Sequence, residues 1–312
     1  MQNFTSLSDV PDPQGLIATA EACQAKPWMP QVGTGITIGL IFFNPSLRTR
    51  MSTQKAAINL GAQTMVMNVG QDGWALEMED GAVMDGDSQE HIKDAVRVMS
   101  QYCDILGVRT FATLTDREGD YQEAVLSKFR EYATVPVISL ESATRHPLQS
   151  LTDVLTIKNL GLKKPKIAVT WAPHPKALPQ AVTNSFLEWS SLLEADVVLA
   201  HPEGYNLHPE FAAHADVITH NQAEALADAD IVYTKNWSSY ENYGKRPAVA
   251  EDWTVSEEKM ALTKHGVFMH CLPLRRNVVA TDGVVDQSLV YTQAGNREYA
   301  AQAVLKTMIE AL

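Results

Sequence analysis

The segment 42–50, with the sequence FFNPSLRTR, places a serine, a threonine and two arginines directly after an apolar run. The Asn-Pro-Ser step ends that run, and Ser46 is positioned to cap a following helix. Backbone N–H groups at a helix start, together with Arg48, Thr49 and Arg50, form an anion site, because arginine can hold phosphate through two hydrogen bonds. The alternative interpretation is an ordinary capped helix whose basic first turn is solvated.

Two further segments place reactive side chains after apolar runs. In 146–149, HPLQ, a histidine and a glutamine three residues apart share one helical face. They offer an acid or hydrogen-bond donor beside an amide that both donates and accepts. In 270–276, HCLPLRR, Cys271 precedes paired arginines. Taken singly, such a histidine fits a polar surface position, Cys271 fits a small core side chain and the arginines fit a solvated surface.

Short β-branched or apolar runs alternate with helical patterns along the chain, which predicts parallel sheets covered by helices. The predicted strands are 36–43, 64–69, 104–108, 135–140, 166–171, 196–200, 230–234, 267–270 and 289–292. The predicted helices are 49–60, 90–102, 121–132, 147–160 and 296–312. We therefore predict an α/β fold with two doubly wound parallel-sheet domains joined by a helix. A ligand cleft is expected at the carboxyl ends of the strands.

Composition limits the classes of function. A chain of 312 residues with 45% hydrophobic content predicts about two domains. A net charge of −12 without a basic block argues against nucleic acid or a membrane surface as a partner. Cys23, Cys103 and Cys271 show no CxxC or zinc-like spacing, which favours a reducing cytoplasm. The polar start is unlike a secretory signal, and no apolar run is long enough to span a bilayer.

The segments SLRTR, HPLQ and HCLP, in this order and each after a predicted strand, together resemble the carbamoyltransferase family. This family includes the ornithine and aspartate carbamoyltransferases, and the resemblance covers essentially the whole chain. It implies a carbamoyl phosphate-binding domain over 1–147, a second-substrate domain over 148–290 and a C-terminal helix over 291–312 that packs back on the first domain. It also implies a homotrimer with shared active sites, and neither a metal nor a cofactor.

The resemblance assigns one group of residues to the phosphate of carbamoyl phosphate, namely Ser46, Leu47, Arg48, Thr49 and Arg297. Arg109 matches the family arginine that spans the phosphate and the carbonyl oxygen. Trp74 matches a residue that reaches the site from a neighbouring subunit.

At the carbamoyl group, His146 matches the donor to the carbonyl oxygen. Gln149 and the backbone carbonyls of Cys271 and Leu272 match the groups that hold the NH₂. A neutral amine attacks the carbamoyl carbon, so negative charge develops on the carbonyl oxygen. Preorganised donors there usually make the largest catalytic contribution. The resemblance thus implies catalytic roles for Arg109, His146, Cys271 and Thr49, and a cis peptide bond between Leu272 and Pro273.

The acceptor is indicated by the segment 234–240, TKNWSSY. Ornithine carbamoyltransferases resemble one another in an Asp-Val-Trp stretch here, whose acid meets the α-ammonium of free ornithine, followed by Ser-Met-Gly. This chain has Lys235 and no Ser-Met-Gly, which is similar to the N-acylornithine branch and implies arginine biosynthesis through acylated intermediates. In that branch Glu141, His174 and Arg275 match acylornithine-binding positions within and beside the domain 148–290. Taken alone, Lys235 also fits a surface lysine.

The acyl group is either succinyl or acetyl. The segments 141–149 and 171–175 resemble the succinyl type, and Val279 stands where acetyl-type enzymes carry a lysine. Gln89 lies in a loop that reaches the acyl end, where acetyl-type enzymes have Glu and succinyl-type enzymes have Pro. A neutral glutamine would not repel a second carboxylate and could donate to it. We predict N-succinylornithine as the acceptor, with N-acetylornithine as the alternative.

Two other classes of protein compete with this interpretation. A doubly wound dehydrogenase needs a GxGxxG turn after its first strand, and the chain has none. A catalytically inactive regulator that only binds carbamoyl phosphate would lack a phosphate-gripping arginine or His146, and the chain retains both.

Overall fold

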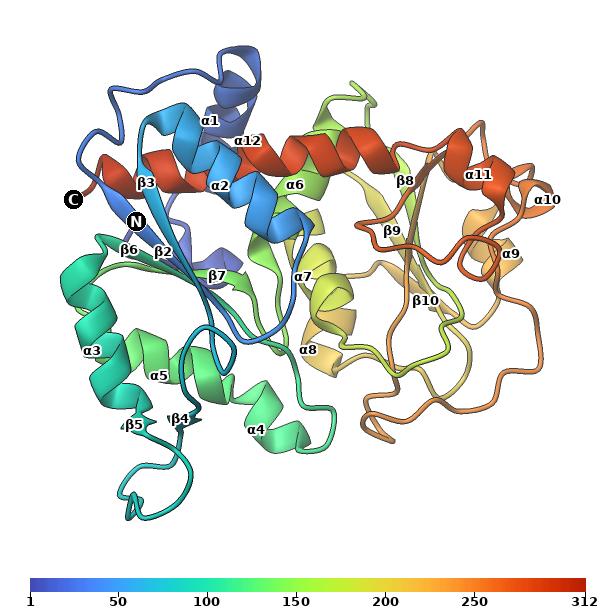
Figure 1. The fold of residues 1–312 in the computed structure, drawn as a ribbon. Coiled ribbons are helices and arrows are strands. Elements are labelled where there is room, and N and C mark those ends of the chain that lie inside the picture. Colours follow the sequence, from blue (N-terminus) through green and yellow to red (C-terminus); the bar gives the residue numbers. More distant parts are fainter. The chain divides into compact units, whose positions relative to one another are not determined.

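The computed structural model describes all residues from 1 to 312, and the chain divides into two compact units (Figure 1). The first unit contains residues 1–112, 118–148 and 297–312, and the second contains 113–117 and 149–296. Two helices carry the chain between the units, α6 (Pro147–Lys158) and α12 (Val290–Ile309). The predicted α/β class is confirmed, because each unit is built around one parallel five-stranded sheet.

The sheet of the first unit has the strand order β1-β7-β6-β2-β3, with every pair parallel. Its strands are β1 (Asn3–Phe4), β2 (Thr37–Phe42), β3 (Gln63–Asn68), β6 (Ile105–Arg109) and β7 (Val137–Glu141). The central strands read as nearly continuous apolar runs because helices cover both faces of the sheet. Helices α3 (Ile92–Tyr102) and α5 (Ala124–Tyr132) cover one face, and α1 (Pro13–Ala25) and α2 (Arg48–Leu60) lie on the other (Figure 1).

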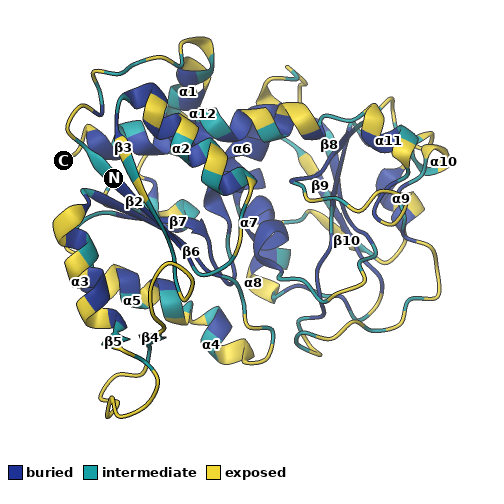
Figure 2. Cartoon of the chain, in the orientation of Figure 1, coloured by how far each residue is buried: buried dark blue, intermediate teal, exposed yellow.

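The small elements of the first unit are η1 (Leu7–Asp9), α4 (Arg117–Tyr121), whose first residue falls in the second unit, and the strand pair β4 (Leu76–Glu77) and β5 (Glu90–His91). The loop between β4 and β5 is almost entirely exposed (Figure 2). The last part of α12 and the three residues after it, 297–312, also belong to this unit, where Asn59 Nδ2 donates to Glu298 Oε1 at 2.7 Å.

The second unit repeats the architecture with the strand order β10-β9-β8-β11-β12. Its strands are β8 (Lys166–Trp171), β9 (Asp196–Ala200), β10 (Val217–Thr219), β11 (Ile231–Lys235) and β12 (Val267–Met269). Its remaining helices are α7 (Ala181–Ser190), α8 (Pro209–Ala212), α9 (Gln222–Leu226), α10 (Glu257–Met260) and α11 (Asp282–Asp286). None of the helices in the chain combines the length and the apolar character that a membrane crossing requires.

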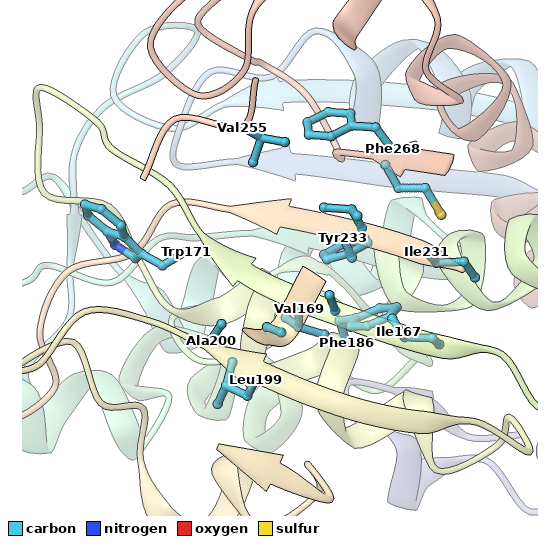
Figure 3. Close-up of a cluster of buried hydrophobic side chains, with 14 of the residues drawn as sticks. Ile167, Val169, Trp171, Phe186, Leu199, Ala200, Ile231, Tyr233, Val255 and Phe268 are labelled. Atoms are coloured by element: carbon cyan, nitrogen blue, oxygen red, sulfur yellow. The ribbon is translucent and has the colours of Figure 1, made fainter. Parts of the chain in front are cut away.

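The core of the second unit gathers the inward side chains of four of these strands together with the buried face of α7 (Figure 3). Phe186 of α7 stacks flat on Tyr233 of β11, with ring centroids 4.1 Å apart. Trp171 lies at the carboxyl end of β8 and meets Tyr205 at 4.6 Å. This apolar packing holds the carboxyl ends of β8 and β11 in place, and Lys235 is the last residue of β11.

Two sequence predictions are wrong in this structure. The segment 289–292 is not a strand, because Val290 begins helix α12, which the sequence placed only from 296 onward. A four-residue apolar run cannot be distinguished from a first helical turn by its pattern alone, and here the Ser288 hydroxyl accepts from Val290 N at 3.3 Å.

The second error concerns Ser46, which does not cap helix α2. The N-cap residue is Leu47, without a side-chain cap, and the Ser46 hydroxyl instead accepts from an arginine of the neighbouring strand β6. Helix α2 ends at a glycine in the left-handed region, as many helices do. Gly61 has φ +79°, and a Cβ at this position would lie 2.1 Å from Pro30 O.

Asp153 of α6 is fully buried and accepts hydrogen bonds from three side chains in the second unit. Its Oδ1 receives Gln149 Nε2 at 2.7 Å and Gln293 Nε2 at 2.6 Å, and its Oδ2 receives the Tyr233 hydroxyl at 2.7 Å. One carboxylate therefore connects α6, the start of α12 and β11.

We predict that Asp153→Ala lowers the free energy of unfolding by about 3 kcal/mol or more, because each buried donor left without an acceptor costs about 1–3 kcal/mol. Urea unfolding followed by tryptophan fluorescence measures the change. The matched control is Asp196→Ala, whose exposed ion pair with Lys164 spans 2.9 Å and should contribute under about 1 kcal/mol. Equal effects of the two substitutions would contradict the connecting role of Asp153.

Candidate functional site

Arg109, the last residue of β6, is the centre of a buried polar cluster in the first unit. Its NH1 donates to Ser46 Oγ at 2.6 Å and to Thr49 Oγ1 at 3.0 Å. Its NH2 lies 3.0 Å from Glu141 Oε2, and its side chain is about nine-tenths shielded from water. A buried guanidinium needs such partners because leaving a charge unpaired in a low-dielectric interior is costly.

A local irregularity of the sheet positions this ion pair. Strands β6 and β7 shift register between Val108 and Arg109, so that Arg109 pairs with Glu141 instead of Leu140. Bulges of this kind commonly redirect a side chain beside a functional site. Here the shift places the arginine and the carboxylate at the same carboxyl edge of the sheet.

Thr49, in the first turn of α2, connects two arginines. Its hydroxyl accepts from Arg109 NH1 at 3.0 Å and from Arg297 NH2 at 2.7 Å, although the two arginines are far apart in sequence. Thr49 and Arg297 are both buried. Arg109 Nε is also buried and has no hydrogen-bond partner within the protein, which leaves a donor for a ligand. Two guanidinium groups at a helix start suit a phosphate.

His146 borders this cluster, with Nε2 at 3.7 Å from Glu141 Oε2. The turn between Glu141 and His146 is held by Glu123, a residue that the sequence analysis did not select. Glu123 Oε1 accepts from Thr144 N at 2.9 Å and from Ser142 Oγ at 2.7 Å. No sequence motif marks Glu123, because its role depends on a turn nearly twenty residues further along the chain.

A second polar cluster lies in the second unit around His174, which follows β8. His174 Nδ1 lies 3.0 Å from Lys176 O, and Arg275 Nε donates to His174 Nε2 at 3.2 Å. Lys176 N also donates to Nδ1 at 3.0 Å, so an N–H group of the protein faces each ring nitrogen. Burial lowers the pKa of His174, and the neighbouring charges of Arg275, Lys235 and Arg246 lower this pKa further. His174 is therefore neutral at pH 7 and is surrounded by cations.

The structure brings most of the predicted site residues into one of these two clusters. Ser46, Thr49, Arg109, Glu141, His146 and Arg297 belong to the first unit, with Leu47 and Arg48 beside them at the start of α2. His174, Lys235 and Arg275 gather in the second unit. Glu141, which the resemblance assigned to the acylornithine, is in direct contact with Arg109.

Three more predicted residues also lie in the second unit. Gln149 is buried and donates to Asp153, and Cys271 is buried after β12. Leu272 N donates to His270 Nδ1 at 2.9 Å. The predicted cis peptide bond between Leu272 and Pro273 is confirmed.

Trp74 and Gln89 join neither cluster. Trp74 is 56% exposed and donates only to Glu90 Oε2 at 2.9 Å. Gln89 is exposed and donates to Asp87 O at 3.2 Å. Both belong to the stretch that runs from β3 to β5 on the surface of the first unit (Figure 2).

Comparison with known proteins gives the same assignment for both halves of the chain. Residues 2–159 match the family model of the aspartate/ornithine carbamoyltransferase carbamoyl-P binding domain, and residues 179–308 match that of the Asp/Orn binding domain. The N-succinylornithine carbamoyltransferase of Bacteroides thetaiotaomicron is 48% identical over 100% of both chains.

Less similar relatives are named for N-acetylornithine as the acceptor. The N-acetylornithine carbamoyltransferase of Xanthomonas axonopodis pv. citri is 39% identical over 88% of this chain and 86% of the relative. A solved variant of N-acetyl-L-ornithine transcarbamylase, in complex with carbamyl phosphate and N-succinyl-L-norvaline, superposes with a TM-score of 0.91. It is 34% identical and covers 99% of this chain and 100% of the other.

We predict that Thr49→Val weakens the binding of inorganic phosphate about tenfold, since the substitution removes the shared acceptor that orients two arginines. Isothermal titration with phosphate measures the affinity. Thr53→Val is the matched control, because Thr53 is one turn further along α2, is equally buried and has a hydroxyl without a partner. An unchanged affinity in Thr49→Val would show that the hydroxyl does not organise an anion site.

Proposed function

Because the chain belongs to the aspartate/ornithine carbamoyltransferase family, as its three motifs predicted, we propose that it carbamoylates the δ-amine of N-succinylornithine. Carbamoyl phosphate is the donor, and the products are N-succinylcitrulline and phosphate, in arginine biosynthesis. The observation that carries this choice of acceptor is the group of cations around His174. N-Succinylornithine offers two carboxylates to these cations, whereas free ornithine has only one and would bring an α-ammonium that they repel.

Carbamoyl phosphate is bound by the buried cluster of the first unit. The phosphate lies at the start of α2 against Ser46, Leu47, Arg48, Thr49 and Arg297, and Arg109 spans the phosphate and the carbonyl oxygen. The Arg109 guanidinium is already oriented by Glu141 at 3.0 Å and by two hydroxyls. Little reorganisation is then needed when charge develops during the reaction. Gln149 and the backbone carbonyls of Cys271 and Leu272 hold the carbamoyl NH₂.

The reaction proceeds by attack of the neutral δ-amine on the carbamoyl carbon. A C–N bond forms, and the carbonyl oxygen becomes an oxyanion stabilised by Arg109, Thr49 and His146. The C–O bond to the phosphate then breaks, and the amine proton leaves with the phosphate. Arg297 and Arg109 stabilise the departing phosphate charge, while Glu141 keeps Arg109 in position.

The acylornithine is bound by Lys235, Arg275 and neutral His174, with Glu141 and Gln89 as further contacts. His174 Nε2 accepts from Arg275 Nε at 3.2 Å and so keeps Arg275 oriented. N-Acetylornithine remains the second candidate acceptor, because a relative of that specificity is 39% identical. The N-succinylornithine carbamoyltransferase of Bacteroides thetaiotaomicron is more similar, at 48% identity. A neutral Gln89 also allows a second carboxylate.

The active enzyme is a homotrimer of the cytoplasm in this proposal, with Trp74 and the Gln89 loop completing a neighbour's site. An apolar face of the first unit supports assembly. Leu47, Met51 and Ile58 lie on one side of α2 and are 54–65% exposed, and Met65 is 54% exposed on the neighbouring edge strand β3. Such contiguous exposed apolar side chains favour a protein interface.

We predict that N-succinylornithine is the best acceptor, that N-acetylornithine follows and that free ornithine is negligible. A colorimetric citrulline assay on the three acceptors, at a fixed carbamoyl phosphate concentration, measures kcat/KM for each. Comparable citrulline formation from free ornithine would refute the acylated acceptor.

The same assay tests Lys235→Asp, which should lose acylornithine turnover at least about tenfold through like-charge repulsion. Carbamoyl phosphate affinity should be nearly unchanged. Lys264→Asp makes the same charge change at an exposed position and is the control. Equal loss of turnover and of carbamoyl phosphate affinity would make Lys235 a structural residue.

The shared active site predicts complementation between two inactive variants. Trp74→Ala and Arg109→Gln should each lose about 10² or more in rate as pure proteins. Unfolding and reassembling an equal mixture should restore up to about one quarter of wild-type activity, because random trimers contain sites with an intact Arg109 and an intact neighbouring Trp74. Absence of recovery in mixed trimers, or full activity of a verified monomer, would contradict the shared site.

A further inference from the structure

Arg246 is the one member of the cation group in the second unit that belongs to none of the sequence motifs. Its NH1 donates to the backbone carbonyl of His174 at 2.9 Å, although the two residues are 72 positions apart in the chain. The His174 ring atom Nε2 accepts a hydrogen bond from Arg275 Nε at 3.2 Å. Two guanidinium groups are thus attached to a single residue, one through the backbone and one through the ring.

The backbone around Arg246 is fixed on both sides. Gly244 has φ +69° and lies so close to Leu114 O that a Cβ would be 2.0 Å from it, so only glycine fits there. Lys245 N donates to Asn242 O at 2.8 Å, and Lys245 O accepts from Ser239 N at 3.0 Å. On the far side, the Tyr205 hydroxyl donates to Pro247 O at 2.8 Å. The guanidinium is therefore presented from an ordered turn.

The cations of this cluster lack carboxylate partners. Lys235, Arg246 and Arg275 form no ion pair within the protein, and all three charges lower the pKa of His174. Like charges held together repel one another, and the arrangement is relieved when anionic groups bind among them. After its bond to His174, Arg246 retains further N–H donors on its guanidinium fork, which suits a carboxylate.

The number of carboxylates separates the two acylated substrates. N-Succinylornithine carries two, the α-carboxylate and the terminal carboxylate of the acyl group, whereas N-acetylornithine carries only the first. Lys235 and Arg275, which the sequence motifs supply, are the cations assigned to the α-carboxylate. Arg246 is exposed and belongs to a separate turn, and its bond to His174 O keeps it beside the other two cations, so it can receive a second carboxylate.

We propose that Arg246 binds the terminal carboxylate of the succinyl group and thereby sets the preference for succinyl over acetyl. This inference rests on the proposed function, since it concerns the acceptor of the same reaction. Arg246 is a specificity residue here and takes no part in the bond changes at the carbamoyl carbon.

Arg246→Gln tests the proposal, with Lys245→Gln as the matched control. Lys245 is adjacent and exposed, and its hydrogen bonds are made by its backbone alone, so the control removes the same charge from the same turn. Both proteins are titrated with N-succinylnorvaline and N-acetylnorvaline in the presence of carbamoyl phosphate. These analogues lack the δ-amine and report binding without turnover. Thermal unfolding midpoints equal to wild type verify the fold.

The expected result is a selective loss. Arg246→Gln should weaken N-succinylnorvaline binding about 10- to 100-fold and change N-acetylnorvaline binding less than about threefold. The ratio of kcat/KM for the two acylornithines should shift by the same factor, and Lys245→Gln should match wild type. Equal loss for both analogues would place Arg246 on the shared α-carboxylate and overturn the proposal, as would no loss for either.

The wild-type assay separates this test from the function itself. If the wild-type enzyme carbamoylates neither acylornithine, the proposed function is wrong whatever Arg246 does. If wild type prefers N-succinylornithine and Arg246→Gln keeps that preference, only the role of Arg246 is refuted.

Discussion

Arg109 carries a full positive charge on a side chain that is almost completely shielded from water. Several neighbouring groups of the first unit are placed so that they pair with this charge. A carboxylate must lie beside the guanidinium, and the register shift between β6 and β7 brings Glu141 to 3.0 Å from it. Its other donors need acceptors, and the hydroxyls at the start of α2 supply them. The turn after Glu141 must then be fixed, and Glu123 fixes it from a separate segment. The buried charge is thus satisfied, and Arg109 Nε is still without a partner in the protein.

The two units handle charge in opposite ways. In the first unit, Arg109 is paired with Glu141, so its guanidinium is oriented before any ligand binds. In the second unit, the cations near His174 have no carboxylate partner, and burial together with these charges lowers the pKa of the histidine. An enzyme that must hold a reactive donor in one geometry and admit an anionic acceptor benefits from this division. The preorganised cluster suits the chemical step, and the unneutralised cluster suits selection of the acceptor.

Much of the fold was predictable because most strands of both sheets are buried on both faces and therefore read as apolar runs. Strands β8 and β9 begin and end at the predicted residues. Helix α7 was not predicted, because it too is buried on all sides. Nearly all of its residues are buried, so it lacks the alternation of apolar and polar faces that marks a surface helix. The start of α12 was read as a strand because β-branched residues in one short turn outweighed the longer helical pattern.

The sequence by itself determined the residue types on which the proposed donor site depends, since SLRTR, HPLQ and HCLP each follow an apolar run and carry their chemistry within a few neighbouring positions. Neighbouring residues in the sequence are sufficient to identify such motifs. Only the tertiary structure decided which of these groups meet. Ser46 does not cap a helix as predicted, and its hydroxyl instead accepts from Arg109, a residue 63 positions away. The tertiary structure also brought Arg246 to His174 across 72 residues of chain. Such contacts depend on strand order, register shifts and the path of turns, and no short stretch of sequence contains that information.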